Sequence, residues 1–271
     1  MKPIILVTND DGIYSPGLKL LYEAVSSLGR TVVVVPETPK SSSGMGLTLH
    51  KPLRAYTIKY RGMLVYLING TPSDIIHFAY RKIVPKIDLV VSGVNIGDNT
   101  SIQVILSSGT VAAAIQAWLL GIPSIAFSAA VESGEAFEKD KTLAEAIKRT
   151  CRALVKRVLK EGLTEADFLN VNFPSKITEK TRVVIAKPAR LRFIENIEER
   201  TDPRGKKYYW IYGVPTLPKE NTDTYELLVN KNIVLTPIKF ELSCPLSPRL
   251  RSLEKTLNSI LHDIVKEKIN K

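Results

Sequence analysis

The sequence predicts an α/β protein with a doubly wound, mostly parallel sheet covered by helices, followed by a C-terminal β-hairpin arm and a terminal helix. Three observations support this fold class. Short β-branched runs alternate with segments whose apolar residues recur at helical spacing. The β-branched runs are apolar throughout, as strands buried on both faces are. Beyond Pro174, charged and aromatic residues mix without a helical period.

The first half of the chain contains the clearest strand and helix signals. Ile4–Thr8 and Thr31–Val35 are β-branched runs and are expected to be strands. Between them, Gly17–Leu28 repeats its apolar residues every three or four positions, which predicts a helix. The same two patterns predict a strand at Leu64–Ile68, a helix near Ser73–Arg81 and a strand at Ile87–Ser92. Such an alternation is Rossmann-like.

No charged residue occurs between Asp98 and Glu132. A membrane span is one interpretation of such a run, but Ala, Ser and Thr are frequent in it and a Gly-Ile-Pro turn signal interrupts it. We therefore expect a buried helix at Gly109–Leu120 that leads into a buried strand at Ser124–Ser128. No association with a membrane is expected.

The second half begins with a long amphipathic helix, expected at Glu135–Lys160, and a strand, expected at Asp167–Phe173. The motif DPRG at Asp202–Gly205 is typical of a tight turn and is expected to form the tip of a long β-hairpin. Apolar residues at helical spacing return in Ser247–Ile269, which predicts the terminal helix.

The amino-acid composition excludes fewer possible functions than the motifs do. A formal net charge of +11 over 271 residues suits a polyanionic partner, but it suits a lysine-rich solvated surface equally well. Cys151 and Cys244 have neither metal-ligand nor disulfide-framework spacing, so a reducing compartment is expected. The first residues do not resemble a signal peptide. We therefore expect a cytoplasmic protein.

Asn9, Asp10 and Asp11 directly follow the first expected strand. Ligands of open parallel sheets bind at the carboxyl ends of the strands, so these residues lie where a site is expected. A single Asp there would read as a helix cap. Two adjacent carboxylates repel each other unless a cation or a proton shares the site. A divalent metal ion resolves that conflict directly.

Neutral oxygen donors follow two other expected strands. The second strand leads to Ser41, Ser42, Ser43 and Gly44, and the strand ending at Ser92 leads to Asn95. These loops would open on the same edge of the sheet as the acidic pair. Hard cations such as Mg²⁺ take carboxylates together with neutral oxygens and water. The combination therefore favours a metal site more than any loop does alone.

The stretch SSGTVAAA at Ser107–Ala114 places small and hydroxyl-bearing residues at a helix start. Free backbone N–H groups and the helix dipole suit a bound anion there, although a simple Ser or Thr cap is an equally good interpretation. A metal site and an anion site together favour hydrolysis of a phosphate ester. Neither a GxSxG elbow nor a GxxxxGK[ST] loop is present. The three histidines, His50, His77 and His262, share no motif, and structural roles are expected for them.

With these motifs assembled, the sequence resembles the SurE (survival protein E) family of metal-dependent 5′/3′-nucleotidases. The resemblance spans most of the chain in the family's order. The motifs that carry it are ILVTNDDGIYSPG, VVVPETPKSSSGMGLTL, NGTPSD, DLVVSGVNIGDN, SSGTVAAA with GIPSIAFS, RGKKYYWIYG and IVLTPI.

The resemblance implies one divalent cation per subunit, Mg²⁺ or Mn²⁺. Its ligands would be Asp10, Asp11, Asn95 and one serine, which the spacing to GLTL puts at Ser41, with Ser43 as the alternative. The chain departs from the family in two places. Lys40 stands where an arginine is usual and keeps the charge, whereas Ser107 stands where an aromatic residue is common and changes the wall of the substrate pocket.

The resemblance also implies hydrolysis of nucleoside 5′- or 3′-monophosphates, with acid phosphatase-like chemistry and activity on short polyphosphate. Asn9, Asp10 and Asp11 would be catalytic. Phosphate oxygens would contact Asn9, Gly44, Ser108, Gly109 and Thr110. Direct attack by water is favoured over a phospho-enzyme, because carboxylates that bind a metal are poor free nucleophiles.

Tyr208, Tyr209, Trp210 and Tyr212 cluster in an arm with little core of its own, and exposed aromatic clusters usually bind a partner. Members of the resembled family pair through an extended C-terminal region, so a homodimer or homotetramer is expected. The expected parts are a Rossmann-like catalytic core at 1–180, an extended β-hairpin arm for oligomerisation at 181–246 and a C-terminal helix at 247–271.

Two non-enzymatic alternatives remain. A receiver-like domain also has an acidic pair after its first strand, but it needs a further Asp at a later strand end, where this chain has Ser92 to Asn95. A module that binds single-stranded nucleic acid would explain the charge, but only RGKKYYWIY interleaves basic and aromatic residues. Nucleic acid is therefore not expected as a partner.

Overall fold

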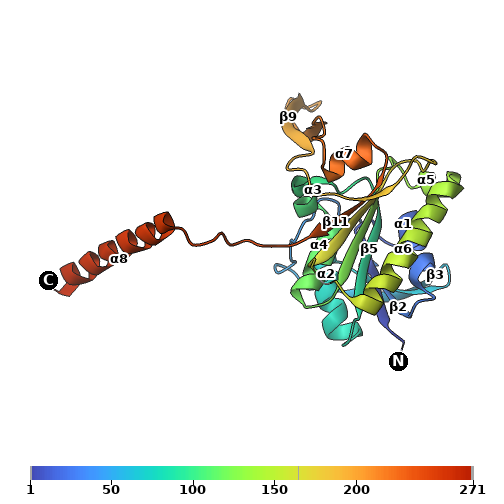
Figure 1. Ribbon diagram of the computed structural model, residues 1–271, viewed down its shortest axis with the longest axis horizontal. Helices are drawn as coiled ribbons and strands as arrows, with labels where there is room; N and C mark the ends of the chain where they lie inside the picture. Colours follow the sequence, from blue (N-terminus) through green and yellow to red (C-terminus); the bar gives the residue numbers. More distant parts are fainter. Residues whose placement is uncertain (1, 164, 270–271) are drawn as a thin grey trace. The chain divides into compact units, whose positions relative to one another are not determined.

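The computed structural model describes residues 2–163 and 165–269. Its main feature is a nine-stranded sheet in the order β3-β4-β2-β1-β5-β6-β7-β11-β8 (Figure 1). The strands are β1 (Ile4–Thr8), β2 (Arg30–Pro36), β3 (Ala55–Tyr60), β4 (Met63–Ile68), β5 (Leu89–Ile96), β6 (Ser124–Ala129), β7 (Phe168–Phe173), β8 (Val183–Ile185) and β11 (Ile233–Ile238). Only the β3–β4 and β7–β11 pairs are antiparallel among the described strands of this sheet. The predicted α/β fold class is confirmed.

The helices are α1 (Pro16–Val25), α2 (Pro72–Phe78), α3 (Ser101–Ser107), α4 (Gly109–Leu119), α5 (Glu135–Lys139), α6 (Lys141–Glu161), α7 (Asp223–Leu228) and α8 (Pro248–Ile269), with a π-helical turn, η1, at Ala79–Ile83. Helices α1, α2, α4 and α6 cover the sheet on two sides, because alternate residues of each strand point to opposite faces. On β1, Ile5 and Val7 pack with α1 and α6, whereas Leu6 packs with α2 and α4. This is the doubly wound arrangement.

The parallel strands bring their carboxyl ends to one edge of the sheet. β1, β2 and β5 end at Thr8, Pro36 and Ile96, so the loops that follow them are neighbours. In Figure 1 the amino terminus lies at the lower edge of the sheet, and α3 and α7 lie at the opposite edge. The topology therefore gathers the loops that carry Asp10 and the serine run beside Asn95, which lies near the end of β5.

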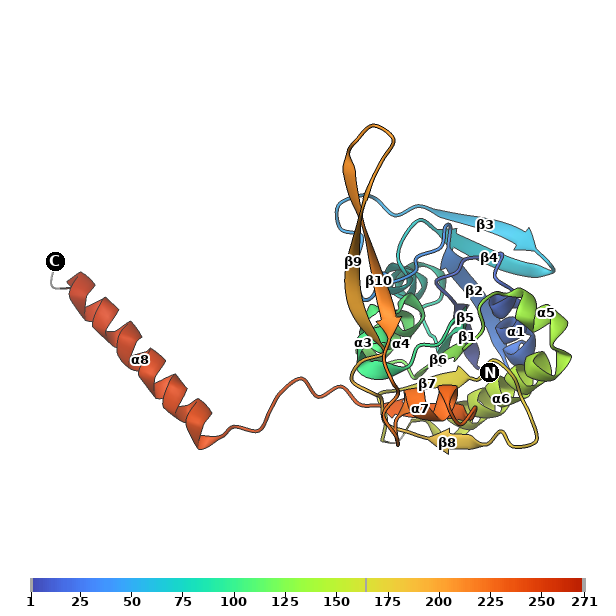
Figure 2. The same ribbon diagram turned by 90° about the horizontal axis from the view of Figure 1, so that it is seen from above.

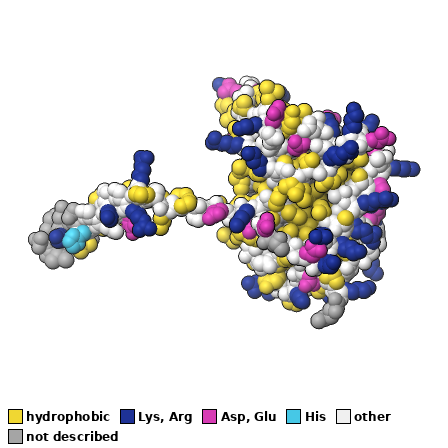
Figure 3. Space-filling view, in the orientation of Figure 1, with side chains coloured by type: hydrophobic (Ala, Val, Ile, Leu, Met, Phe, Trp, Pro, Cys, Tyr) yellow, Lys and Arg dark blue, Asp and Glu magenta, His cyan; other side chains and the backbone are white. Residues whose placement is uncertain are grey.

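The hairpin arm is confirmed as a two-stranded sheet of its own. β9 (Phe193–Thr201) pairs antiparallel with β10 (Lys207–Pro215). The tip is the expected turn, with Gly205 at φ +81° and its N–H donating to the Asp202 carbonyl at 2.9 Å. Figure 2 shows the hairpin extending beyond the sheet and helices. Hydrophobic side chains gather on it in Figure 3, and the side chain of Trp210 is 58% exposed.

Several elements differ from the expectations. The predicted helix at Glu135–Lys160 is two helices, because the Asp140 side chain accepts from Leu143 N and starts α6. The uncharged segment contains two helices rather than one, since α3 precedes α4. Strands β3, β8 and β11 and helix α7 were not expected as elements. β3 and β8 lie at the edges of the sheet and are largely exposed. β3 mixes polar and apolar residues and β8 has only three residues, so neither gives a clear strand signal.

Residues 240–271 form a separate unit from residues 1–239. Within it, α8 confirms the predicted terminal helix, and the side chains of Leu253 and Leu257 are exposed. Residues 270 and 271 of that prediction lie outside the described residues. No single helix of the described chain is long and apolar enough to cross a membrane. Only α3 and α4 taken together reach that length and composition, and they are bent by 76°.

Candidate active site

The loop after β1 is held by the side chain of Asn9. Its Nδ2 donates to the Gly12 carbonyl at 2.9 Å, and its Oδ1 accepts from Gly12 N at 3.1 Å. Gly12 has φ +85°, a conformation that favours glycine. Asn9 itself is fully buried. The Asn-Asp-Asp-Gly sequence thus forms a tight turn that fixes the backbone of the two aspartates between its ends.

Asp10 lies against the start of α4. Its side chain is 5% exposed, and it accepts a hydrogen bond from the hydroxyl of Thr110. The same hydroxyl lies 3.4 Å from Asn95 Oδ1. Asn95 Nδ2 donates to the carbonyls of Ile96 and Gly97, which orients its oxygen toward Thr110. Side-chain oxygen atoms from the loop after β1 and from the end of β5 therefore meet at one hydroxyl group of α4.

The two carboxylates disfavour each other's charge. Burial raises the pKa of Asp10. Burial, and then the charge of Asp10, raise the pKa of Asp11 to about 6, against weaker hydrogen bonds from Ile96 and Ser15. Among the described residues no Lys, Arg or His side chain forms an ion pair with either carboxylate. The negative charge of this pair is therefore not neutralised by any described side chain, so the pair suits a bound cation.

The serine loop lies beside this pair. Lys40 N donates to the Asp10 carbonyl at 2.8 Å, which anchors the start of the loop. Ser41 is exposed. The Ser43 hydroxyl is buried and has no hydrogen-bond partner in the described part of the chain. Gly44 N is occupied by the Ser107 carbonyl at 2.9 Å, so this amide holds the loop to α3.

Gly109 marks where the loops converge. A Cβ atom added to it would lie 2.8 Å from Asp10 Oδ2 and 2.9 Å from Ser43 Oγ. Any side chain there would therefore enter the space between the acid and the serine. Ser108 caps α4, because its hydroxyl accepts from Val111 N at 3.2 Å. Asp10 also accepts from the Thr110 backbone, so its charge lies at the positive end of the helix dipole.

Of the predicted site residues, Asp10, Asp11, Asn95, Gly109 and Thr110 lie together at one edge of the sheet. Asn9, Gly44 and Ser108 lie beside them, but their printed hydrogen bonds shape the loops. Among the described residues, no hydrogen bond or ion pair joins His50 or His77 to the site. His50 is exposed, His77 lies in α2 and His262 lies in α8.

Sequence reasoning missed the residues that hold the loop after β5, which follows Asn95. Asn172 Oδ1 accepts from Asn99 N at 2.8 Å, and Asn170 Nδ2 donates to the Asn99 carbonyl at 2.8 Å. Asn99 Nδ2 donates to Ser128 Oγ at 2.8 Å. The available signal was two asparagines at alternate positions of an otherwise apolar strand, which places both on one buried face.

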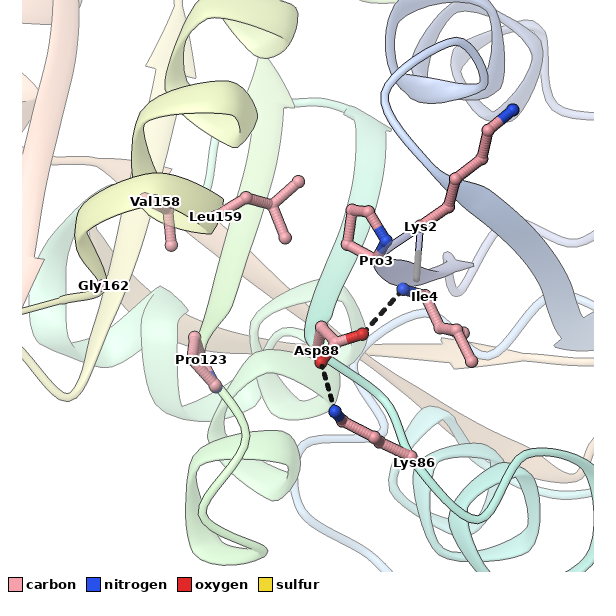
Figure 4. A pocket seen from close by; sticks show the side chains of 9 residues that line it. All are labelled: Lys2, Pro3, Ile4, Lys86, Asp88, Pro123, Val158, Leu159 and Gly162. Atoms are coloured by element: carbon pink, nitrogen blue, oxygen red, sulfur yellow. Dashed lines mark hydrogen bonds and ion pairs between the residues drawn. The ribbon is translucent and has the colours of Figure 1, made fainter.

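A pocket of about 470 Å³ lies at the opposite edge of the sheet (Figure 4). Its charged groups partner one another. Asp88 Oδ2 accepts from Ile4 N at 2.8 Å, and Asp88 Oδ1 lies 3.7 Å from Lys86 Nζ. The Lys2 side chain points away from this carboxylate in Figure 4. Because this pocket lies at the amino ends of the strands, it is separate from the acidic pair.

Comparisons with known proteins show which family the chain is similar to. Residues 5–195 match the model of the family described as survival protein SurE. A 5′-nucleotidase SurE from Hyperthermus butylicus is 54% identical over 88% of this chain and 86% of its own length. A 5′-nucleotidase SurE from Thermofilum pendens is 50% identical over 92% and 95%. The crystal structure of the SurE protein from Aquifex aeolicus has a TM-score of 0.72 at 37% identity, over 89% of this chain and 95% of that one.

Proposed function

Because this chain belongs to the survival protein SurE family, we propose that it is a 5′-nucleotidase, a phosphomonoesterase that releases a nucleoside and phosphate. One observation carries the assignment to this site. The buried Asp10 and half-buried Asp11 carboxylates adjoin each other without a cationic side chain among the described residues, beside the start of a helix. Such a site suits a cation and the phosphate ester that the cation would bind.

The donor set fits a hard divalent cation, Mg²⁺ or Mn²⁺. It consists of the carboxylates of Asp10 and Asp11, the oriented amide oxygen of Asn95 and a serine hydroxyl. No group of three His, Cys, Asp or Glu side chains capable of holding a metal occurs in the described residues, so neutral oxygens must complete any site here. When bound, such a cation polarises the phosphoryl oxygens and lowers the pKa of water.

The choice of serine rests on different observations for each candidate. Ser41 directly follows Lys40, whose N–H is bonded to the Asp10 carbonyl, and its exposed hydroxyl is free to turn toward a ligand. Ser43 has a buried hydroxyl without a partner in the described chain, next to Gly109 and Asp10. We propose Ser41 as the ligand and Ser43 as the alternative.

The residues of this chain bind and orient the phosphoryl group. Gly109 leaves space beside Asp10, and the first turn of α4 directs its N–H groups toward that space. Asn9 and Gly44 fix the two loops that enclose it. Asp10 is buried and already bonded to Thr110, so it is a poor nucleophile, and direct attack by water is proposed. These groups would contact only the phosphoryl group of a substrate. Because 3′-monophosphates and short polyphosphate carry the same group, this supports the proposal that the protein also hydrolyses them.

A phosphate-release panel tests this function. Nucleoside 5′- and 3′-monophosphates and short polyphosphate are incubated with Mg²⁺, Mn²⁺ or a chelator. We expect release from 5′-monophosphates that requires the metal. Release from no substrate under any condition would contradict the assignment, and full release in chelator would contradict the metal site.

We also propose a homodimer or homotetramer assembled through the hairpin arm within residues 181–246. The support is the exposed apolar surface of β9 and β10, where Ile194 is 63% and Trp210 is 58% exposed. A soluble chain rarely leaves such a surface uncovered. A cytoplasmic location is proposed from the cysteines, which are free at Cys151 and Cys244.

A further inference from the structure

A second pocket, of about 300 Å³, lies where the serine loop, α3 and the hairpin meet. This volume is at the lower end of the range for small-molecule sites. Its walls come from three parts of the chain that are distant in sequence. They are Ser42, then Gln103, Val104 and Ser107 of α3, then Phe193, Glu195, Ile211, Tyr212 and Gly213 of the hairpin.

The pocket shares two walls with the candidate active site. Ser42 lines the pocket, and the next residue, Ser43, has its hydroxyl beside Asp10 and Gly109. Ser107 lines the pocket, and the next residue, Ser108, begins α4. Adjacent residues are about 3.8 Å apart along the chain. A molecule with its phosphate at the start of α4 can therefore reach the pocket with its other end.

The side chains of the pocket suit a nucleobase. Phe193 and Tyr212 provide aromatic surface, against which bases pack. Phe193 is held in place, because a Cβ on Gly213 would lie 2.7 Å from its Cβ and the Arg192 guanidinium lies 4.6 Å from its ring centroid. Glu195 Oε1 accepts from Gln103 Nε2 at 2.7 Å. Its second oxygen has no partner among the described residues.

Resting on the proposed nucleotidase activity, we propose that this pocket binds the base of the nucleotide and that Glu195 selects bases with an exocyclic amino group. The carboxylate accepts hydrogen bonds but donates none when ionised. Adenine offers an amino group to it, whereas hypoxanthine presents a carbonyl oxygen at the same position. The pocket thereby adds base preference to a site that otherwise recognises only the phosphoryl group.

Gln103 makes this pocket a fixed part of the structure. Its Oε1 accepts from the N–H groups of Arg192 and Phe193, both at 3.0 Å. Its Nε2 donates to the Phe193 carbonyl at 3.1 Å as well as to Glu195. Four hydrogen bonds from one side chain join the base of the hairpin to α3. Removing the Glu195 carboxylate leaves three of them intact.

The test compares kcat/KM for adenosine 5′-monophosphate, inosine 5′-monophosphate and ribose 5-phosphate, which has no base. We expect the wild type to favour the adenine over the hypoxanthine nucleotide by about tenfold, the effect of one hydrogen bond to a charged group. Glu195→Ala should bring that ratio close to one. Val104→Phe, which fills the pocket, should lower the ratio of adenosine monophosphate to ribose 5-phosphate by about tenfold.

Glu199→Ala is the matched control, because Glu199 is an exposed carboxylate of the same strand that pairs with Lys207 outside the pocket. Calorimetric binding of adenosine gives a readout that needs no catalysis. Equal kcat/KM values for all three substrates, together with no binding of adenosine, would overturn the base subsite while leaving the nucleotidase proposal intact. Binding of adenosine that depends on Glu195, in a protein that hydrolyses none of the three, would support the subsite and overturn the proposed function.

Discussion

At the scale of single residues, the main feature of the candidate site is the adjacent pair of carboxylates of Asp10 and Asp11. The sequence alone indicated a conflict of charges, and the structure shows how the fold maintains it. Burial would by itself favour protonation, but the hydroxyl and backbone N–H of Thr110 favour the charged form of Asp10. Burial, and then the charge of Asp10, raise the pKa of Asp11 to about 6 despite hydrogen bonds from Ile96 and Ser15. The protein therefore carries an acidic pair that a cation would stabilise.

The metal-free protein should become less stable as pH rises through the titration of Asp11. The unfolded chain loses this proton near the ordinary value of 3.8, whereas the native chain keeps it up to a pH of about 6. Between these values the native state binds more protons, so its free energy of unfolding is highest at low pH and falls as pH rises. Denaturant unfolding in chelator from pH 4 to 7 measures this. The decrease should be smaller in Asp11→Asn, and identical curves for both proteins would contradict the shift.

Neutral ligands should matter less than acidic ones. Ser41→Ala and Asn95→Ala remove geometry but no charge, and water can occupy a vacated position. Each should lower activity by less than Asp10→Ala does. Ser43→Ala, measured in parallel, identifies the serine, because only the ligand substitution should weaken metal binding by calorimetry. If Asn95→Ala abolished metal binding while Asp10→Ala preserved it, the ligand assignment would be wrong.

Gly109→Ala tests the space between the loops. The added methyl group would lie within 3 Å of both Asp10 Oδ2 and Ser43 Oγ, so one of the loops must shift. We expect activity to fall by about a hundredfold, as misplacement by about 1 Å does in other sites. Circular dichroism should show an intact fold. Gly121→Ala adds a methyl group in open space but at a φ of +75°, so it measures the effect of backbone strain without a side-chain clash. Wild-type activity of Gly109→Ala would contradict the packing described here.

At the scale of elements, the sequence predicted the strands and helices that position the site, because their apolar patterns are strong. It failed where the signal is weak or non-local. α3 was merged into one uncharged segment, although it carries Gln103 and connects the hairpin to the serine loop. β11 lies beside β7 through pairing that no local pattern reveals. The need for a glycine at position 109 could not be predicted either, because it depends on the Asp10 and Ser43 side chains, which are distant in sequence.

The buried polar residues of β7 provide a further test at this scale. Asn172→Leu removes the acceptor for Asn99 N and leaves that donor buried, which should cost about 1–3 kcal/mol of unfolding free energy. The substitution should also weaken metal binding, because the loop that follows Asn95 loses a hydrogen bond that holds it in place. Thr236→Val is the control, since its hydroxyl is buried without a partner in the described chain. Thermal melts and calorimetry measure both effects, and equal behaviour of the two variants would contradict the positioning role.

At the scale of the whole molecule, the exposed hairpin predicts self-association. Its aromatic and aliphatic side chains have little apolar cover within the described part of one chain. Lys and Arg side chains are scattered over the face shown in Figure 3 rather than gathered in one patch, so that face does not resemble a nucleic-acid surface. Light scattering at micromolar concentration should give a mass of at least twice 30.1 kDa. A monomer under these conditions would refute the proposed assembly.

The central claim is that Asp10 and Asp11 hold a divalent cation on which phosphate release depends. The most direct measurement compares the wild type with Asp11→Asn, in phosphate release and in thermal melts, with Mn²⁺ and with chelator. The substitution keeps the shape and removes one charge. We expect activity to fall by about two orders of magnitude and the metal-induced gain in melting temperature to shrink, because a ligand stabilises the native state that binds it. Equal activity of both proteins, or full wild-type activity in chelator, would contradict the claim.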